Sequence, residues 1–195
     1  NVEIPADKSN YGSFNKLADE AEANLRVIVE EAAGAKAATG SDQQQPTITT
    51  LSDGSYVVSW ISYGQDDSEY GVFLQRYSAS GTKVGAEVQV NTFASNSQHE
   101  PAIAALSDGG FVVTWTSYWQ ETSDYYDYSG IYAQRFDASG AKVGDEVQVN
   151  TYTYDYQSAP AVTGLSDGGY VVTWTSNGQD GSYRGIYAQR FDANG

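Results

Sequence analysis

Aromatic side chains gather in the loops between the β-type stretches of this sequence. The chain of 195 residues contains 16 tyrosines and 4 tryptophans, which is a high number. Tyr and Trp each present a flat apolar face and a polar tip, so they are suited to recognising sugars or proteins. Because aromatic residues beyond the needs of a core tend to lie at interfaces, these loops are predicted to form a binding surface. The ligand-binding candidates are Tyr63, Tyr118, Trp119, Tyr125, Tyr126 and Tyr183.

The same loops carry carboxylates. Calcium prefers clustered carboxylate and carbonyl oxygens, so a cation site is one interpretation of these acids. Their spacing matches no defined calcium loop, and solvated acids that aid solubility are the alternative. No other cofactor is predicted. The candidate metal ligands are Asp66, Asp67, Asp124, Asp127 and Asp180.

The sequence shows no arrangement typical of a catalytic centre. His99 is the only histidine, and the chain has no cysteine. Nucleophilic catalysis needs a nucleophile, a base and an orienting group together. Acidic loops of this kind are more often solvated surface than the paired carboxylates of a glycosidase. The sequence therefore predicts that the protein is not an enzyme, and that His99 is a surface residue between two repeats.

A ten-residue stretch that positions these loops occurs three times, at residues 51–60, 106–115 and 165–174. Its Asp-Gly step supplies the positive φ that a tight hairpin turn requires. The residues after the turn alternate between two faces, as in a β-strand rich in Val, Thr and aromatics. The tryptophans that end the copies are about 55 and 59 residues apart, and self-similarity at such a spacing indicates a repeat architecture.

Each repeat is predicted to contain four short antiparallel strands, the first of which starts at a proline. The repeats span residues 46–91, 101–150 and 160–195, and the third lacks its fourth strand. Residues 1–5 contain Val2-Glu3-Ile4, which matches the fourth-strand pattern Val-Gln-Val. This segment is predicted to complete a sheet in cis or in a neighbouring subunit, with Val2 and Ile4 as assembly residues.

Residues 11–40 break the β pattern. Phe14, Leu17, Ala21, Leu25 and Ile28 recur at three- and four-residue spacing, which predicts one amphipathic helix followed by a linker. The helix would either lie against the β-domain or serve in docking and oligomerisation.

Bulk composition restricts the partners. The formal net charge is −15, so no basic surface is expected for nucleic acid or an anionic membrane. No apolar run approaches the ~20 residues of a membrane span. The hydrophobic content of 40% against 18% charged residues is that of a folded chain rather than a disordered one.

Two strings of the repeat, Ser-Asp-Gly-Gly-Tyr-Val-Val-Thr-Trp and Gly-Ile-Tyr-Ala-Gln-Arg-Phe-Asp, resemble repeats of large secreted bacterial proteins, many of them adhesin-like. The resemblance covers residues 45–195. It implies units like β-propeller blades and a secreted or cell-surface location, and it carries no catalytic residues.

The sequence thus predicts an all-β repeat protein of three four-stranded antiparallel sheets with one N-terminal helix. Three blades are fewer than the four to eight of ordinary propellers. The chain is therefore part of a larger propeller, or half of a six-bladed ring of two chains, or a β-prism-like body. Two functions follow: an extracellular structural protein that assembles through sheet-edge strand complementation, or an adhesin or lectin-like module. The second would bind glycan or a cell surface through its Tyr/Trp/Asp loops, with or without calcium, and its favoured site is the loop of Trp119.

Overall fold

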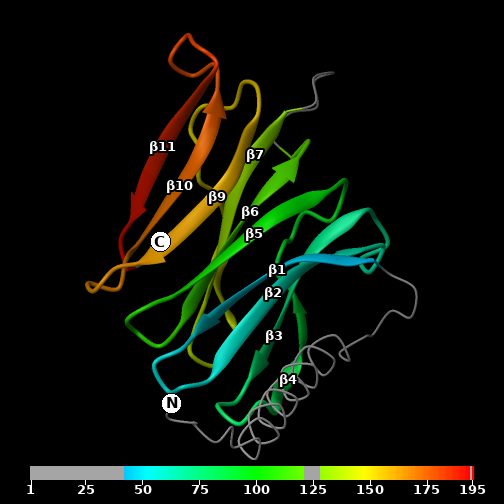
Figure 1. Ribbon diagram of the computed structural model, residues 1–195, viewed down its shortest axis with the longest axis vertical. Coiled ribbons are helices and arrows are strands. Elements are labelled where there is room, and N and C mark those ends of the chain that lie inside the picture. The colour runs from blue at the N-terminus through cyan, green and yellow to red at the C-terminus, as the bar shows by residue number, and fades with distance from the viewer. Residues whose placement is uncertain (1–41, 121–127, 194) are drawn as a thin grey trace, which may run out of the picture. The chain divides into compact units, whose positions relative to one another are not determined.

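The computed structural model describes residues 42–120, 128–193 and 195, which form eleven strands in three antiparallel sheets (Figure 1). Each sheet is a meander that follows the order of the chain, and the three-sheet repeat fold predicted from the sequence is confirmed. Blade 1 contains β1 (Gln43–Thr50), β2 (Tyr56–Tyr63), β3 (Tyr70–Tyr77) and β4 (Lys83–Gln89); blade 2 contains β5 (Gln98–Ala105), β6 (Phe111–Tyr118), β7 (Ser129–Phe136) and β8 (Lys142–Gln148); blade 3 contains β9 (Gln157–Gly164), β10 (Tyr170–Asn177) and β11 (Arg184–Phe191).

The Asp-Gly turn closes the first hairpin of each blade, as predicted. In blade 1, Asp53 Oδ1 accepts a hydrogen bond from Ser55 N at 2.9 Å, and Gly54 has φ +81°. Asp-Gly suits this turn because the aspartate closes it from the side while glycine takes the left-handed conformation without strain.

The first strand of each blade begins three residues before its proline. The sequence predicted that the strand starts at the proline itself. In blade 1 the β1–β2 register shifts between Gln44 and Thr47, so Pro46 lies in a β-bulge. A bulge tolerates proline because it interrupts the hydrogen-bond ladder that proline cannot join. The residue before the proline has positive φ in every blade: Gln45, Glu100 and Ala159.

The blades stack in series through their first strands. β5 contacts β1, β2 and β3 of blade 1, and β9 contacts β5, β6 and β7 of blade 2 (Figure 1). Each of the two contacts encloses an apolar core. The repeated tryptophans Trp60, Trp115 and Trp174 are 6%, 0% and 5% exposed, which confirms them as core residues. β4 and β8 form the outer edges of their blades.

Arginines of the third strands connect neighbouring blades. Arg135 Nη2 lies 2.7 Å from Asp108 Oδ2 and Arg190 Nη2 lies 2.5 Å from Asp167 Oδ2, each within one blade. Arg76 Nη1 also donates to the carbonyl of Ser139, and Arg135 Nη1 donates to that of Ala193. Arg135 therefore holds the turn of the following blade as well as that of its own.

Several predicted features lie outside the described residues: the strand at 1–5 with Val2 and Ile4, and the helix and linker at 11–40. In the part of the chain that the structure describes, the third sheet has three strands. No helix of that part is long and apolar enough to cross a membrane.

Candidate functional site

Four rings form a continuous row at the end of blades 1 and 2 where the second strand of each blade finishes. The Tyr63 and Tyr70 ring centroids are 5.1 Å apart, those of Tyr70 and His99 are 5.1 Å apart, and those of His99 and Tyr118 are 5.7 Å apart. We call Tyr63, Tyr70, His99 and Tyr118 the aromatic row. It crosses from one blade to the next, so residues more than 50 positions apart in the sequence meet in it.

Strand register explains why these residues meet. Tyr63 ends β2 and Tyr70 begins β3, and the two are direct cross-strand partners. Tyr118 occupies the position of Tyr63 in blade 2. His99 is the second residue of β5, just before the bulge, and β5 is the strand that lies against blade 1. The blade-to-blade contact therefore inserts the imidazole between tyrosines of two blades.

Carboxylates border the row. Asp42 Oδ2 accepts hydrogen bonds from Tyr70 OH at 3.3 Å and from Gln44 Nε2 at 2.5 Å. Glu69 accepts a hydrogen bond from Ser97 Oγ. Glu100, the neighbour of His99, is the third carboxylate, and its Oε2 accepts hydrogen bonds from Thr116 Oγ1 at 2.9 Å and from Ala159 N at 2.7 Å.

The local environment of Tyr70, His99 and Tyr118 shifts each pKa in the direction that favours the uncharged ring. Burial lowers the pKa of His99, although the charges of Glu100 and Glu69 oppose this shift. Burial raises the pKa of the Tyr118 phenol, and the charge of Glu100 adds to the effect. Burial likewise raises the pKa of Tyr70, with the charge of Asp42 acting in the same direction. A neutral imidazole and neutral phenols can each both donate and accept hydrogen bonds.

Trp119 follows the row in a backbone conformation that favours glycine. Its φ is +65°, and the same position is Gly64 in blade 1 and Gly178 in blade 3, with φ +68° and +72°. In each blade this residue donates its N–H across the loop, here to Tyr128 O at 3.0 Å. A large side chain in this conformation costs stability and is typical of a functional position. The indole is 52% exposed, so it is available to a ligand.

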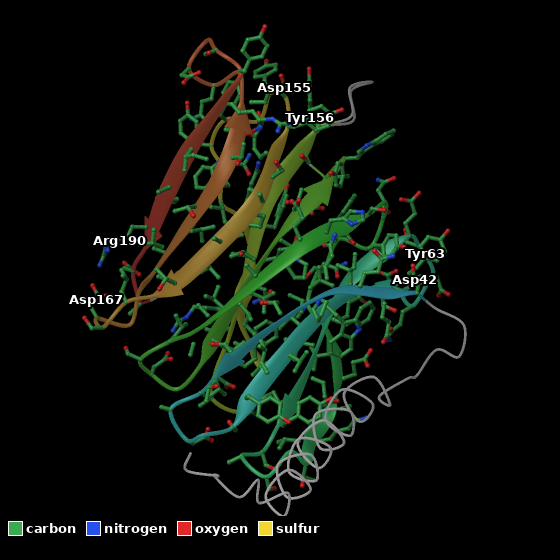
Figure 2. The ribbon with its side chains drawn as sticks, viewed as in Figure 1. Asp42, Tyr63, Asp155, Tyr156, Asp167 and Arg190 are labelled. Atoms are coloured by element: carbon green, nitrogen blue, oxygen red, sulfur yellow. The ribbon has the colours of Figure 1, made fainter. Side chains whose placement is uncertain are left out.

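Aromatic side chains continue from the row toward blade 3. The rings of Tyr128 and Tyr156 are 6.4 Å apart, and Tyr156 is 45% exposed. Asp155 beside it accepts a hydrogen bond from Asn177 Nδ2 at 2.6 Å. Figure 2 shows Tyr63 with Asp42, and Tyr156 with Asp155, at the loop end, and Arg190 with Asp167 at the opposite end of the sheets.

Two of the predicted ligand-binding residues, Tyr63 and Tyr118, lie in the aromatic row, and Trp119 follows Tyr118 in the chain. That these residues bind a ligand stays a prediction. Tyr183 is separate: it is 88% exposed in the loop between β10 and β11. Tyr125 and Tyr126 lie outside the described residues. The sequence analysis missed His99, which is half-buried within the row and not a simple surface residue. His99 is the second residue of β5, as Gln44 is of β1, and no motif in the sequence marks this position.

The described metal candidates act as turn residues. Asp66 Oδ1 accepts a hydrogen bond from Ser68 N at 3.3 Å, and Asp180 Oδ1 accepts one from Ser182 N at 3.0 Å. Asp67 has φ +65° in the same loop as Asp66. Among the described residues, no three His, Asp or Glu side chains group as metal ligands would. Asp124 and Asp127 lie outside the described part of the chain.

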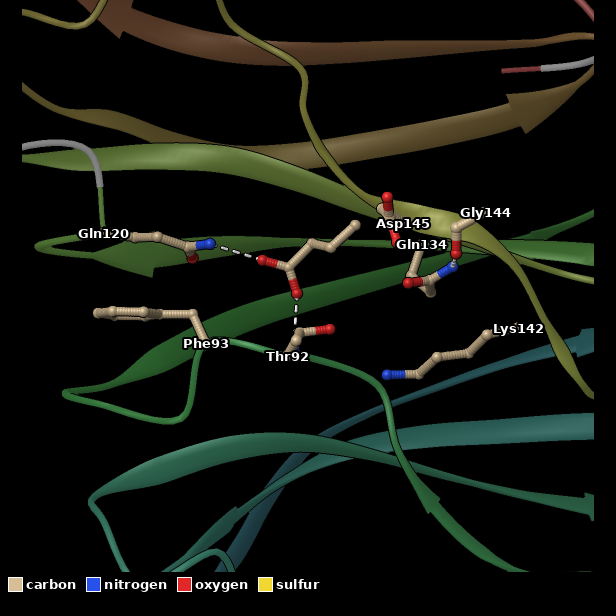
Figure 3. A pocket seen from close by; sticks show the side chains of 8 residues that line it. Thr92, Phe93, Gln120, Gln134, Lys142, Gly144 and Asp145 are labelled. Atoms are coloured by element: carbon tan, nitrogen blue, oxygen red, sulfur yellow. Dashed lines mark hydrogen bonds between the residues drawn. The ribbon is translucent and has the colours of Figure 1, made fainter.

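A second hollow, of about 560 Å³, lies beside β8 (Figure 3). Both oxygens of Glu146 already accept hydrogen bonds there: from Gln120 Nε2 at 2.6 Å and from Thr92 N at 2.6 Å. Burial lowers the pKa of Lys142, and the charge of Glu146 opposes the shift. Glu146 therefore holds the wall of the hollow together. The aromatic row is the better candidate for a ligand site because it gathers four rings, whereas the hollow is lined by the single ring of Phe93.

Comparison with known proteins identifies the fold. No family model matches the sequence, and no curated protein matches it. A Hadza microbial sialidase matches with a TM-score of 0.58 at 12% identity, over 78% of this chain and 36% of that one. A protein of unknown function from Dyadobacter fermentans matches with a TM-score of 0.52 at 16% identity, over 77% and 38% of the two chains. An endo-arabinase from Bacteroides thetaiotaomicron has a TM-score of 0.48 at 14% identity, over 80% and 58%.

The chain spans little more than a third of the first two of these proteins, and the likeness confirms propeller-type blades. It also corrects the prediction that the protein is not an enzyme, because a sialidase is built on the same fold. That prediction relied on the absence of a catalytic motif in the sequence. A propeller instead brings side chains of separate repeats together at the ends of its blades, as in the aromatic row. A site assembled in this way leaves no continuous motif in the sequence.

Proposed function

We propose that this chain forms part of a propeller that recognises carbohydrate, and that the aromatic row with Trp119 is its sugar-binding surface. The observation that carries the proposal is the row itself, in which exposed and half-buried rings of two blades are bordered by Asp42, Glu69 and Glu100. The apolar C–H face of a sugar stacks on such rings, while its hydroxyls donate to carboxylates.

The charge of the site favours a neutral sugar. Among the described groups whose charge acts on the rings of the row, Asp42, Glu69 and Glu100 are all acidic. They would repel a sugar that carries a carboxylate, as a sialic acid does. We therefore expect neutral hexose or pentose chains to bind better than sialylated ones, and we expect the protein to act outside the cell, where such chains are found.

Trp119→Gly is the variant of choice, because glycine is the residue that blades 1 and 3 carry at this position. The variant removes the indole and keeps the turn. The experiment screens a panel of neutral and sialylated glycans with the unmodified protein, with and without calcium, and measures affinity by calorimetry. We expect at least a tenfold loss of affinity for Trp119→Gly and an unchanged affinity for Val84→Ala, an exposed apolar side chain on β4.

Mass spectrometry of the incubated oligosaccharides shows whether any of them is cleaved. Equal affinity of Trp119→Gly and the unmodified protein would refute the site. The absence of binding to every glycan on the panel would refute the function.

The assembly role through sheet-edge complementation stays a prediction, since its residues Val2 and Ile4 lie outside the described part. It predicts that deletion of residues 1–5 changes the mass of the native assembly; an unchanged mass would contradict it.

A further inference from the structure

The face of blade 3 that points away from blade 2 is exposed where the same face of the other blades is buried. Val72 of β3 and Ile131 of β7 are both 0% exposed. Ile186, at the same position of β11, is 76% exposed. The repeat has thus kept an apolar residue at a position that blade 3 leaves in solvent, and a neighbour is expected there.

The two internal contacts show what kind of neighbour fits. In both, the first strand of the following blade covers this face: β5 covers blade 1 and β9 covers blade 2. Ile103 of β5 and Val162 of β9 contribute to the resulting cores. In β1 the same position is Ile48, which is 62% exposed. At one end of the described stack the apolar residue of the first strand is thus exposed, and at the other end the face that such a strand covers is exposed.

We infer that β1 of a second copy of this chain docks on the free face of blade 3, in the place that β5 takes on blade 1 and β9 takes on blade 2. The docking uses β1 itself, because Trp60, Phe73 and Tyr77 on the same face of blade 1 are already buried. Gln44, Pro46, Ile48 and Thr50 of β1 are all exposed, whereas their counterparts in β5 are partly buried.

Arg190 supplies a polar contact for the same neighbour. Arg76 and Arg135 each donate through Nη1 to a turn carbonyl of the following blade. Arg190 Nη2 bonds to Asp167 in its own blade, as Arg135 Nη2 does to Asp108, yet the side chain of Arg190 is 55% exposed against 11% for Arg135. The guanidinium is therefore placed to donate to the turn after β3 of the second copy.

One internal hydrogen bond has no equivalent at this contact. Gln45 Oε1 accepts from Glu100 N at 2.6 Å, and Glu100 Oε2 accepts from Ala159 N at 2.7 Å. The methyl group of Ala159 cannot accept from Gln45 N of a second copy. The contact is thus weaker than the internal ones, and association should depend on protein concentration.

A contact between two different surfaces either closes into a ring or continues as a filament. Two copies of three blades give six, which lies within the range of closed propellers. Light scattering over a range of protein concentrations, with electron microscopy of the same samples, measures the outcome. We expect a dimer, with Ile186→Asp weakening its association at least tenfold and Ala159→Glu, which restores the missing acceptor, strengthening it about fivefold.

The control is Val143→Asp, which places the same charge on a partly exposed valine of β8, away from the free face. Its dimer should be as stable as that of the unmodified protein. Filaments that Ile186→Asp abolishes would also support the contact. The inference would be overturned if the unmodified protein and Ala159→Glu both stayed monomeric at every concentration. It would also be overturned if Ile186→Asp associated as strongly as the unmodified protein while its melting temperature was unchanged. Glycan binding by any of these variants tests the aromatic row separately.

Discussion

Glu100 and Ala159 occupy the same position in successive repeats, and Glu100 Oε2 accepts a 2.7 Å hydrogen bond from the Ala159 backbone N–H. Gln45 stands in the same relation to Glu100, so one side chain per repeat reaches the backbone of the next blade. The reach is possible because the bulge before each proline turns this residue to positive φ. The bulge therefore serves the contact between blades as well as accommodating the proline.

Glu100→Ala should destabilise the chain by about 1–3 kcal/mol, because Oε2 accepts hydrogen bonds from the Ala159 N–H and from the hydroxyl of the buried Thr116, which would lose its partner. Glu100→Gln should cost less, since Gln45 makes the equivalent bond with an amide oxygen. Urea unfolding of the two variants measures the difference. An equal loss in both would show that the charge of Glu100, and not its acceptor oxygen, holds Ala159.

Trp119→Gly should raise stability by about 1 kcal/mol, because a non-glycine residue with positive φ is strained and glycine is not. The thermal midpoint of the variant measures this gain. Trp119→Ala is the control: it removes the indole and keeps the strain, so its stability should not rise. A stable Trp119→Gly variant that no longer binds glycan would show that the strain at this position serves binding.

His99 should make the stability depend on pH in a defined window. Its pKa is lowered by burial in the folded state, below the value near 6.5 that it has when unfolded. Above pH 6.5 His99 is neutral in both the folded and the unfolded chain, so its full contribution to the free energy of unfolding is present. As the pH falls below about 6.5 the unfolded chain binds a proton that the folded chain binds only at lower pH, so stability is lost until the folded pKa is passed.

The variant His99→Gln tests this dependence, because Gln44 holds the same position in blade 1. The chain has no other histidine, so the comparison is direct. Between pH 7 and the onset of carboxylate titration, the unfolding free energy of the unmodified protein should fall while that of the variant stays level. Parallel curves for the two proteins would contradict the burial of a neutral imidazole.

Arg135 and Arg190 hold the same position of the repeat but should contribute differently to the free energy of unfolding. Arg135 is 11% exposed and bonds to blade 3 through Ala193 as well as to Asp108, whereas Arg190 is 55% exposed and bonds to Asp167. Arg135→Ala should therefore destabilise by about 1–2 kcal/mol. Arg190→Ala should change the stability of the monomer much less, since exposed ion pairs are screened by water. Equal losses in chemical unfolding would contradict the bridging role of Arg135.

The three-blade organisation and the Asp-Gly turns could both be predicted from the sequence. Each depends on residues close together in the chain, and each recurs in every repeat. The start of the first strand was predicted wrongly at the proline, because a bulge has no signal that distinguishes it from a strand end. Tyr63, Tyr118 and Trp119 were found as loop aromatics, while His99 was read as an isolated surface residue.

The sequence by itself determined the blade, because alternation, turns and core residues are local properties of the strand. The tertiary structure alone decided the site, because the stacking of β5 on blade 1 brings His99 between Tyr70 and Tyr118 across two repeats. Contacts between blades depend on how sheets pack, and packing follows from the shape of whole surfaces and not from the spacing of residues along the chain.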